Sequence, residues 1–432
     1  MKALFTAFAL LFLTLNISAQ QQVKSQSIKD FQDMKFGMFI HWGPVTLRGT
    51  EIGWSRGHQV ATNDYDNLYK EFNPVLFDAD KWIKTLKDAG MKYLVFTTRH
   101  HDGFSMWDTK FSDYNIMNSP YKKDVLMELK NACDKYGILF GTYYSICDWR
   151  HPNYPISNIK GVDKPDADMD KYYTFLKNQT KELIEKYDTK ILWFDGEWEA
   201  PWTHEYGQDF YNYLKGLNKD ILINNRVDKG RKGMEGITIS NEFAGDFATP
   251  EQRIGTFNVE SPWESCITIC KQWAWKPNDK MKSLDQCIQT LLKTVGGGGN
   301  LLFNVGPMMD GRMEQRQIDR LKEMGNWLKK YGESVYGTTG GPYKPTSWIS
   351  STRKGDKIYL HLFSLENDEL KIPLPGSAEV KSCSLLKGKK LKFEQTKKEL
   401  IIQVPQNLRD KIATTIVLDL NSDSGKIKPI EI

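Results

Sequence analysis

Short apolar runs alternate with amphipathic stretches from residue 36 to residue 331, and this alternation constrains the fold more than any other feature of the chain. Residues 36–40, 93–96 and 191–195 are typical of buried strands, while residues 79–89 and 168–187 carry apolar side chains at helical spacing. Strands that alternate with helices predict a parallel sheet, because each helix returns the chain to the same edge. About seven or eight such units are expected here, which fits a (β/α)8-like (TIM) barrel.

The sequence pattern changes near residue 340. Residues 357–363, 390–393, 400–404 and 414–420 are short runs of β-type residues, separated by turn residues and with no helical stretch between them. Such a pattern predicts a small C-terminal β-sandwich. We therefore expect a catalytic barrel over residues 21–340 and a β-sandwich over residues 341–432.

The first 20 residues are predicted to be a signal peptide. Lys2 precedes an apolar run over residues 3–15, and the small residues Ser18 and Ala19 follow it. The run is too short to span a bilayer, and no later segment is predicted to cross a membrane. We expect cleavage near Ala19 or Gln20 and export to the periplasm or the extracellular medium.

Charge and cysteine content argue against two classes of protein. The chain has 59 Lys+Arg and 54 Asp+Glu, and its basic residues are scattered, whereas a nucleic-acid surface needs concentrated positive charge. No nucleic-acid partner is therefore expected. The six cysteines show no spacing typical of a disulfide framework or a zinc site, so we expect buried thiols or one incidental disulfide.

Polar residues follow several of the predicted strands where each strand ends. The residues at these ends are His41, His100, His101, Tyr143, Tyr144 and Asp195. The carboxyl ends of barrel strands carry the catalytic groups, because the loops there vary while the barrel below stays packed. Asp195, which ends an apolar run, is the first candidate for a catalytic residue.

Three kinds of site could use this set of residues. Histidines with an aspartate could bind a catalytic metal, but His41 is followed by Trp42 and Gly43, not by the second histidine of a His-x-His pair. Neutral histidines could instead bind a polyhydroxylated ligand while carboxylates act as catalysts, as glycoside hydrolysis requires. The third alternative is a carbohydrate-binding barrel without catalysis.

Six motifs in order resemble the α-L-fucosidases of glycoside hydrolase family 29. The motifs are His41-Trp42-Gly43, His100-His101-Asp102-Gly103-Phe104, Tyr143-Tyr144-Ser145, Trp193-Phe194-Asp195-Gly196, Trp263-Glu264 and the run from Gly299 to Pro307. The resemblance implies a β/α barrel with a C-terminal β-sandwich. It also implies exo-acting, cofactor-free and metal-free hydrolysis of terminal α-L-fucose from fucosylated oligosaccharides or glycoconjugates, with retention of configuration.

The resemblance assigns the two catalytic carboxyl groups. Asp195 matches the nucleophile, which must stay ionised, and Glu264 matches the general acid/base, which needs a raised pKa and a place about 5–5.5 Å away. Glu260 is the rival for the second role, and Glu242 and Glu251 remain further candidates.

The resemblance also implies which residues contact the sugar. The matching positions are His41, Trp54, His100, His101, Tyr144 and Trp193. Many relatives have a Glu-Trp pair at Trp54, whereas here Gly53 precedes it and Glu51 lies three positions upstream. The chain predicts neither the fucosyl linkage that is cleaved nor the oligomeric state.

Overall fold

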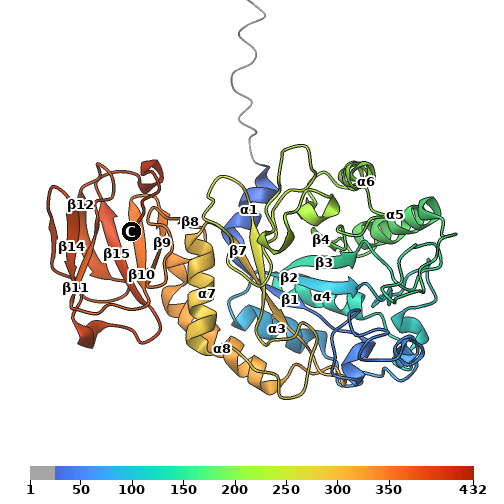
Figure 1. The fold of residues 1–432 in the computed structure, drawn as a ribbon. Helices are drawn as coiled ribbons and strands as arrows, with labels where there is room; N and C mark the ends of the chain where they lie inside the picture. Colours follow the sequence, from blue (N-terminus) through green and yellow to red (C-terminus); the bar gives the residue numbers. More distant parts are fainter. Residues whose placement is uncertain (1–24) are drawn as a thin grey trace, which may run out of the picture.

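The computed structural model describes residues 25–432, so the predicted signal peptide lies outside the described residues. Seven parallel strands form one sheet in the order β5-β4-β3-β2-β1-β7-β6 (Figure 1). These strands are β1 (Phe36–Ile40), β2 (Tyr93–Arg99), β3 (Leu139–Ser145), β4 (Ile191–Asp195), β5 (Leu222–Ile223), β6 (Glu264–Thr268) and β7 (Asn300–Val305). All carboxyl ends point the same way, so the polar residues expected at these ends share one side of the sheet.

An irregular segment, residues 246–252, is hydrogen-bonded to both edge strands of this sheet. The amide N–H of Asp246 donates to Ile223 O on β5 (2.6 Å), and those of Glu264 and Cys266 on β6 donate to Ala248 O (2.9 Å) and Pro250 O (3.0 Å). Residues 237–240 alternate apolar and polar side chains and are therefore a weak strand candidate in the sequence, but they form one isolated bridge, between Thr238 and Arg231, and no strand.

The outer face of the sheet is covered by α3 (Ala79–Asp88), α4 (Val125–Tyr136), α5 (Met169–Glu185), α6 (His204–Leu217), α7 (Leu284–Gly296) and α8 (Gln315–Tyr331). Two further helices lie elsewhere: α1 (Gln26–Met34) packs Phe31 into the inner cluster, and the single turn α2 (Thr62–Tyr65) packs Tyr65 into a small separate cluster. Helices α3, α4 and α5 begin at side chains that satisfy free amide groups: Asp78, Asp124 and Asp168 each accept a hydrogen bond from the backbone three residues on. Ser283 and Gln286 form a capping box at α7, where the sequence predicts the helix start.

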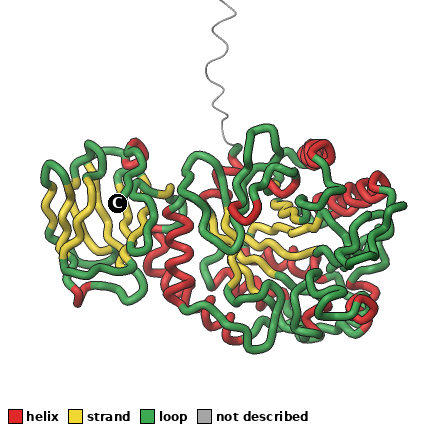
Figure 2. Tube along the Cα trace, viewed as in Figure 1, coloured by secondary structure: helices red, strands yellow, loops and turns green. Residues whose placement is uncertain are grey.

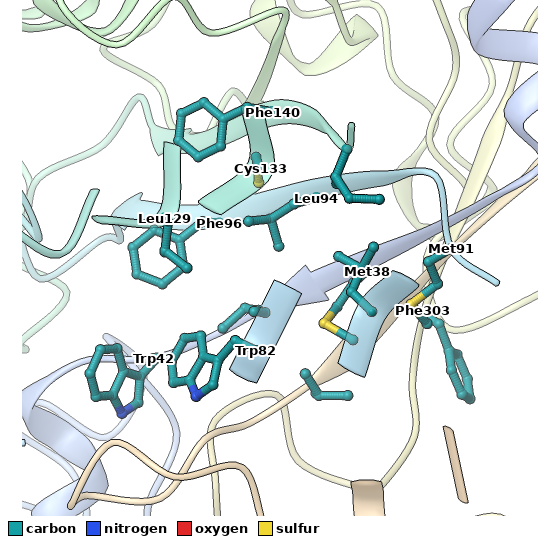
Figure 3. Packing of buried hydrophobic residues seen from close by; sticks show 14 of the residues in the cluster. Met38, Trp42, Trp82, Met91, Leu94, Phe96, Leu129, Cys133, Phe140 and Phe303 are labelled. Carbon is teal, nitrogen blue, oxygen red and sulfur yellow. The ribbon is translucent and has the colours of Figure 1, made fainter. Parts of the chain in front are cut away.

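Two apolar layers hold the parallel sheet in place. Met38, Leu94 and Phe96 point outward into a cluster that also contains Trp82 of α3 and Leu129 of α4 (Figure 3). Because successive side chains of a strand point to opposite faces, the alternate residues point inward. This inner cluster includes Phe39, Tyr93, Val95, Tyr143, Trp193 and Leu302.

The C-terminal region is built from strands, as Figure 2 shows. One antiparallel sheet has the order β12-β15-β10-β9-β8 and a second has the order β11-β14-β13. The strands are β8 (Thr339–Gly340), β9 (Ile349–Lys354), β10 (Lys357–Leu362), β11 (Glu369–Pro373), β12 (Val380–Leu385), β13 (Phe393–Gln395), β14 (Glu399–Gln403) and β15 (Thr414–Leu420). The two sheets share one apolar core, to which Leu360, Leu370, Leu400 and Leu418 contribute.

The five-stranded sheet packs against α7 and α8 of the first region (Figure 1). Tyr359 and Val417 belong to the same apolar cluster as the helices, and Ser350 Oγ donates to Leu292 O in α7 (2.9 Å). All six cysteines are buried free thiols. Within residues 25–432, no helix combines the length and the apolar character needed to cross a bilayer.

Candidate active site

Asp195 is the last residue of β4, at the carboxyl end of the parallel sheet, where it was expected. Its carboxylate accepts hydrogen bonds from Arg226 Nη1 (2.6 Å) and Tyr143 Oη (2.9 Å), and His101 Nε2 lies 3.7 Å away. Burial is the largest single influence on Asp195 and raises its pKa, but the charge and hydrogen bond of Arg226, together with His101 and Arg231, outweigh burial, and the net shift is downward. The aspartate is therefore held ionised, as a nucleophile must be.

One guanidinium joins Asp195 to a second carboxylate. Arg226 lies in a short 3-10 turn after β5 and donates through Nη2 to Glu251 Oε2 (2.9 Å). Glu251 stands near the end of the segment over residues 246–252, beside Cys266 of β6. Because both carboxylates contact the same planar group, they lie close together and cannot move independently.

Three buried histidines surround Asp195 in neutral form. Burial lowers the pKa of His41 to about 3 and that of His101 to about 4, and it lowers the pKa of His100 as well. Asn304 donates to Trp273 O (2.8 Å), so its side-chain oxygen faces His41 and accepts from Nδ1 (2.7 Å). His100 Nδ1 and His101 Nε2 are buried and have no hydrogen-bond partner among the described residues, and His101 Nε2 faces the Asp195 carboxylate.

A pocket of about 240 Å³ opens above Asp195. This is below the range of about 300–1,000 Å³ typical for drug-sized ligands, so the pocket fits a compact group. It is lined by Phe39, His41, Trp54, His100, Tyr143, Trp193, Asp195, Trp198, Arg226, Arg231, Met234, Glu251, Cys266 and Trp273. The exposed rings of Trp54 and Trp198 lie nearly parallel at its mouth, with centroids 6.2 Å apart.

The expected sugar-contacting residues fall into two groups. His41, Trp54, His100 and Trp193 line the pocket, and His101 contacts Asp195 directly. Tyr144 lies elsewhere: its hydroxyl donates to Gln179 of α5 (2.8 Å), on the outer face of the sheet. The structure therefore places Tyr143 at the pocket in place of Tyr144, because neighbouring strand residues point to opposite faces and Tyr143 shares the face of Asp195.

Glu264 does not lie opposite Asp195, contrary to expectation. It is the first residue of β6, at the amino end of the sheet, and it is fully buried. Its carboxyl group accepts hydrogen bonds from Tyr93 Oη and from Trp193 Nε1 (3.1 Å), and burial raises its pKa to about 7. The raised pKa meets one requirement for an acid/base, but Trp193 stands between Glu264 and the pocket, so a sugar cannot reach it.

The other candidate glutamates have different surroundings. Glu260 and Glu242 are exposed to solvent. Glu51 accepts the amide hydrogens of Trp273 (2.8 Å) and Ala274 (3.2 Å), so it anchors the loop that brings Trp273 to the pocket. Of the four glutamates weighed from the sequence for the acid/base role, Glu251 is the one that lines the pocket.

Sequence reasoning did not single out Arg226 or Trp198 as site residues, and it named Tyr143 as a strand-end residue but not as a sugar contact. Arg226 follows the strand at residues 221–223, so its position after a strand end was an available signal. Among residues 25–432, no group of three or more His, Cys, Asp or Glu side chains is arranged to hold a metal ion.

Comparisons with known proteins agree with this geometry. A family model described as "Alpha-L-fucosidase" matches residues 14–333. An α-L-fucosidase of Dictyostelium discoideum is 26% identical over 94% of this chain and 96% of its own. Structures of two bacterial enzymes are also similar: the α-L-fucosidase isoenzyme 1 of Paenibacillus thiaminolyticus (31% identity, TM-score 0.83, 92% of this chain and 99% of that one) and an α-L-fucosidase of Bacteroides thetaiotaomicron (28% identity, TM-score 0.84, 92% and 97%).

The Bacteroides structure is described as a family 29 covalent intermediate trapped with 2-fluoro-fucosyl fluoride in a Glu→Gln mutant. A family match over most of the chain, a strand-end aspartate held ionised and a second carboxylate beside it are consistent with one another. The chain belongs to the α-L-fucosidases of glycoside hydrolase family 29.

Proposed function

We propose that Asp195 is the nucleophile and Glu251 the general acid/base of this retaining α-L-fucosidase. The observation that carries the proposal is the Arg226 guanidinium, which hydrogen-bonds Asp195 and Glu251 at once beside the pocket. Retaining glycosidases need two carboxyl groups about 5–5.5 Å apart. The Arg226 guanidinium, which bonds both carboxylates, is compatible with a separation of this order between Asp195 and Glu251. Glu264 lies at the other end of the sheet and cannot form such a pair with Asp195.

The two groups carry a double displacement. In the first step a carboxylate oxygen of Asp195 bonds to the anomeric carbon of fucose, while Glu251 gives its proton to the departing glycosidic oxygen. In the second step Glu251 takes a proton from water, the water oxygen bonds to the anomeric carbon, and Asp195 leaves as a carboxylate. The intermediate trapped in the Bacteroides relative supports this route, and so does its Glu→Gln mutation.

Neutral imidazoles suit the recognition of sugar hydroxyls. His41, His100 and His101 are held uncharged by burial, so their ring nitrogens can bond sugar hydroxyls without introducing a charge. The Trp54 and Trp198 rings at the mouth offer apolar faces to the C–H groups of a sugar. We propose that these side chains bind the terminal fucose, while the rest of the fucosylated glycan stays outside the small pocket.

Replacing Glu251 by Gln tests the acid/base assignment. The rate on a fucosylated oligosaccharide, whose leaving group needs a proton, should fall by about 10²–10⁴-fold. The first step on an aryl fucoside with a good leaving group should be far less affected, and azide should speed the second step, because an anion needs no general base. Glu242→Gln changes an exposed glutamate that does not line this pocket, so it is the matched control and should behave like the wild type. Wild-type rates of Glu251→Gln on the oligosaccharide would remove Glu251 from this role.

We also propose that residues 246–252 act as the missing strand of an eight-stranded barrel, and that the C-terminal sheets form a β-sandwich. Hydrogen bonds from this segment to β5 and β6, and the apolar core between the two C-terminal sheets, support this. The proposed domains are residues 21–340 and 341–432, although β8 at Thr339–Gly340 already pairs with the C-terminal sheet.

Export remains part of the proposal. The apolar run and the small residues of positions 3–19 support a signal peptide cleaved near Ala19 or Gln20. N-terminal sequencing of the protein recovered from the periplasm or medium tests this. An intact Met1 on the mature protein would contradict it.

A further inference from the structure

We propose that Glu264 is a positioning residue for the reaction, acting on Asp195 through the ring of Trp193. This inference rests on the proposed function, because it assumes that Asp195 is the nucleophile. It assigns a role to a buried carboxyl group that the double displacement does not use.

The first step of the argument is the isolation of Glu264. The side chain is fully buried at the amino end of β6, and both of its hydrogen-bond donors, Tyr93 Oη and Trp193 Nε1, are neutral. A buried carboxyl group without a cationic partner is costly, and a well-packed apolar residue would fill the same place at lower cost. This cost indicates that the carboxyl group has a role, which we attribute to its hydrogen bonds with Tyr93 and Trp193.

The second step is what Glu264 holds. Its Oε1 accepts from Trp193 Nε1 at 3.1 Å, which fixes the rotation of the indole ring inside the barrel. The same side chain lines the pocket. Glu264 therefore controls the orientation of a pocket residue from the opposite end of the sheet.

The third step connects the ring to the nucleophile. The Arg226 guanidinium lies over the Trp193 ring, 4.4 Å from its centroid, and the Tyr143 ring stacks beside it with centroids 5.7 Å apart. Arg226 and Tyr143 are the two side chains that hydrogen-bond Asp195. A tilt of the indole would therefore displace both donors of the nucleophile, and Arg226 would carry Glu251 with it.

Two substitutions of Glu264 test the inference. Glu264→Leu removes the acceptor for Trp193 Nε1, and we expect kcat on an aryl α-L-fucoside to fall by about 10- to 100-fold, as small displacements of reacting groups do. KM should stay within about twofold, since the sugar contacts remain. Glu264→Gln keeps an oxygen that accepts from the indole, and kcat should return to within about threefold of the wild type.

The rescue by Gln separates this role from the alternatives. An acid/base would lose activity in both variants, with a loss that depends on the leaving group and is relieved by azide; that result would overturn this inference and the assignment of Glu251 together. A merely structural Glu264 would lower the melting temperature in Glu264→Leu and leave kcat of the folded enzyme unchanged, which would overturn this inference alone. Wild-type behaviour of Glu251→Gln would instead overturn the proposed function alone.

A second pair of variants keeps the inference testable if Glu264→Leu does not fold. Tyr93→Phe removes the other donor to Glu264, whereas Tyr144→Phe removes an equally buried hydroxyl that bonds Gln179 outside the barrel. We expect kcat to fall by roughly 3- to 10-fold in Tyr93→Phe and by less than about twofold in Tyr144→Phe. Equal effects of the two substitutions would contradict a path through Glu264.

Discussion

Asp195 and Glu264 are both buried carboxyl groups on strands of the same sheet, yet they are opposites in position and electrostatics. Asp195 ends β4 beside the pocket, and the Arg226 charge lowers its pKa. Glu264 begins β6 at the far end, has two neutral donors, and burial raises its pKa to about 7. The chemistry of a buried acid is therefore set by its partners and its strand end, and depth of burial alone does not distinguish the two.

Replacing Asp195 by Gly is expected to have the largest effect. The proposed nucleophile is lost while the pocket remains, so turnover of an aryl α-L-fucoside should fall by at least about 10³-fold. Azide added to the variant should restore part of the rate by attacking the vacated face, and it should yield a β-fucosyl azide, identifiable by NMR. An Asp195→Gly enzyme with near-normal turnover would show that the two carboxyl groups have been assigned in the wrong order.

Replacing Arg226 by Met should have the next largest effect. The variant removes the charge that lowers the pKa of Asp195 and leaves burial, which raises it, so the pKa rises. Because the nucleophile must be ionised, the acidic limb of the kcat/KM profile should move to higher pH, with a fall of about 10²-fold at neutral pH. Arg226→Lys keeps the charge but cannot bridge two carboxylates. Its kcat/KM should also fall, but the acidic limb should move less than in Arg226→Met. An unmoved limb in Arg226→Met would contradict this reading of Asp195.

Glu264 should produce a smaller effect, on stability. Its pKa is about 7 in the folded state against an ordinary 4.5, so between these values the folded protein binds more protons than the unfolded chain. The contribution to the free energy of unfolding is therefore present below about pH 4.5 and is lost as pH rises toward 7, by on the order of 3 kcal/mol in total. Glu264→Gln should remove that slope, measured by urea unfolding across this pH range. Parallel wild-type and variant curves would show that Glu264 does not titrate there.

Most strands and helices could be predicted because their patterns are local. The runs at residues 36–40 and 191–195 form strands with those bounds, and helix ends follow the caps at Asp124 and Ser283. Residues 246–252 could not be found this way. Their sequence, Asp-Phe-Ala-Thr-Pro-Glu-Gln, has no strand periodicity. Their position is fixed by hydrogen bonds to β5 and β6, and a local sequence pattern does not reveal such tertiary contacts.

Site residues could be predicted where their position at the end of a strand was sufficient to locate them. They could not be predicted where the answer depended on which face of the sheet a side chain points to. His41 and His100 directly follow strands and Asp195 ends one, and the structure places all three at the pocket. The choice between Tyr143 and Tyr144 depends on strand register, since one residue reverses the face. Glu264 matches a family motif, but it is the first residue of β6 and therefore lies at the end of the sheet away from the pocket. The sequence did not show where β6 begins, so this position could not be predicted.

The apolar cluster shared by α7, α8 and the five-stranded sheet has a practical consequence for anyone wishing to shorten the enzyme. Tyr359, Leu386, Ala413 and Val417 complete the packing of the same core that supports β7. A chain truncated after α8 would expose the apolar surface of α7 and α8 to water, and exposed apolar surfaces of this kind promote aggregation. The C-terminal region, residues 341–432, is therefore expected to be needed for the stability of the barrel and not to be removable as an independent domain.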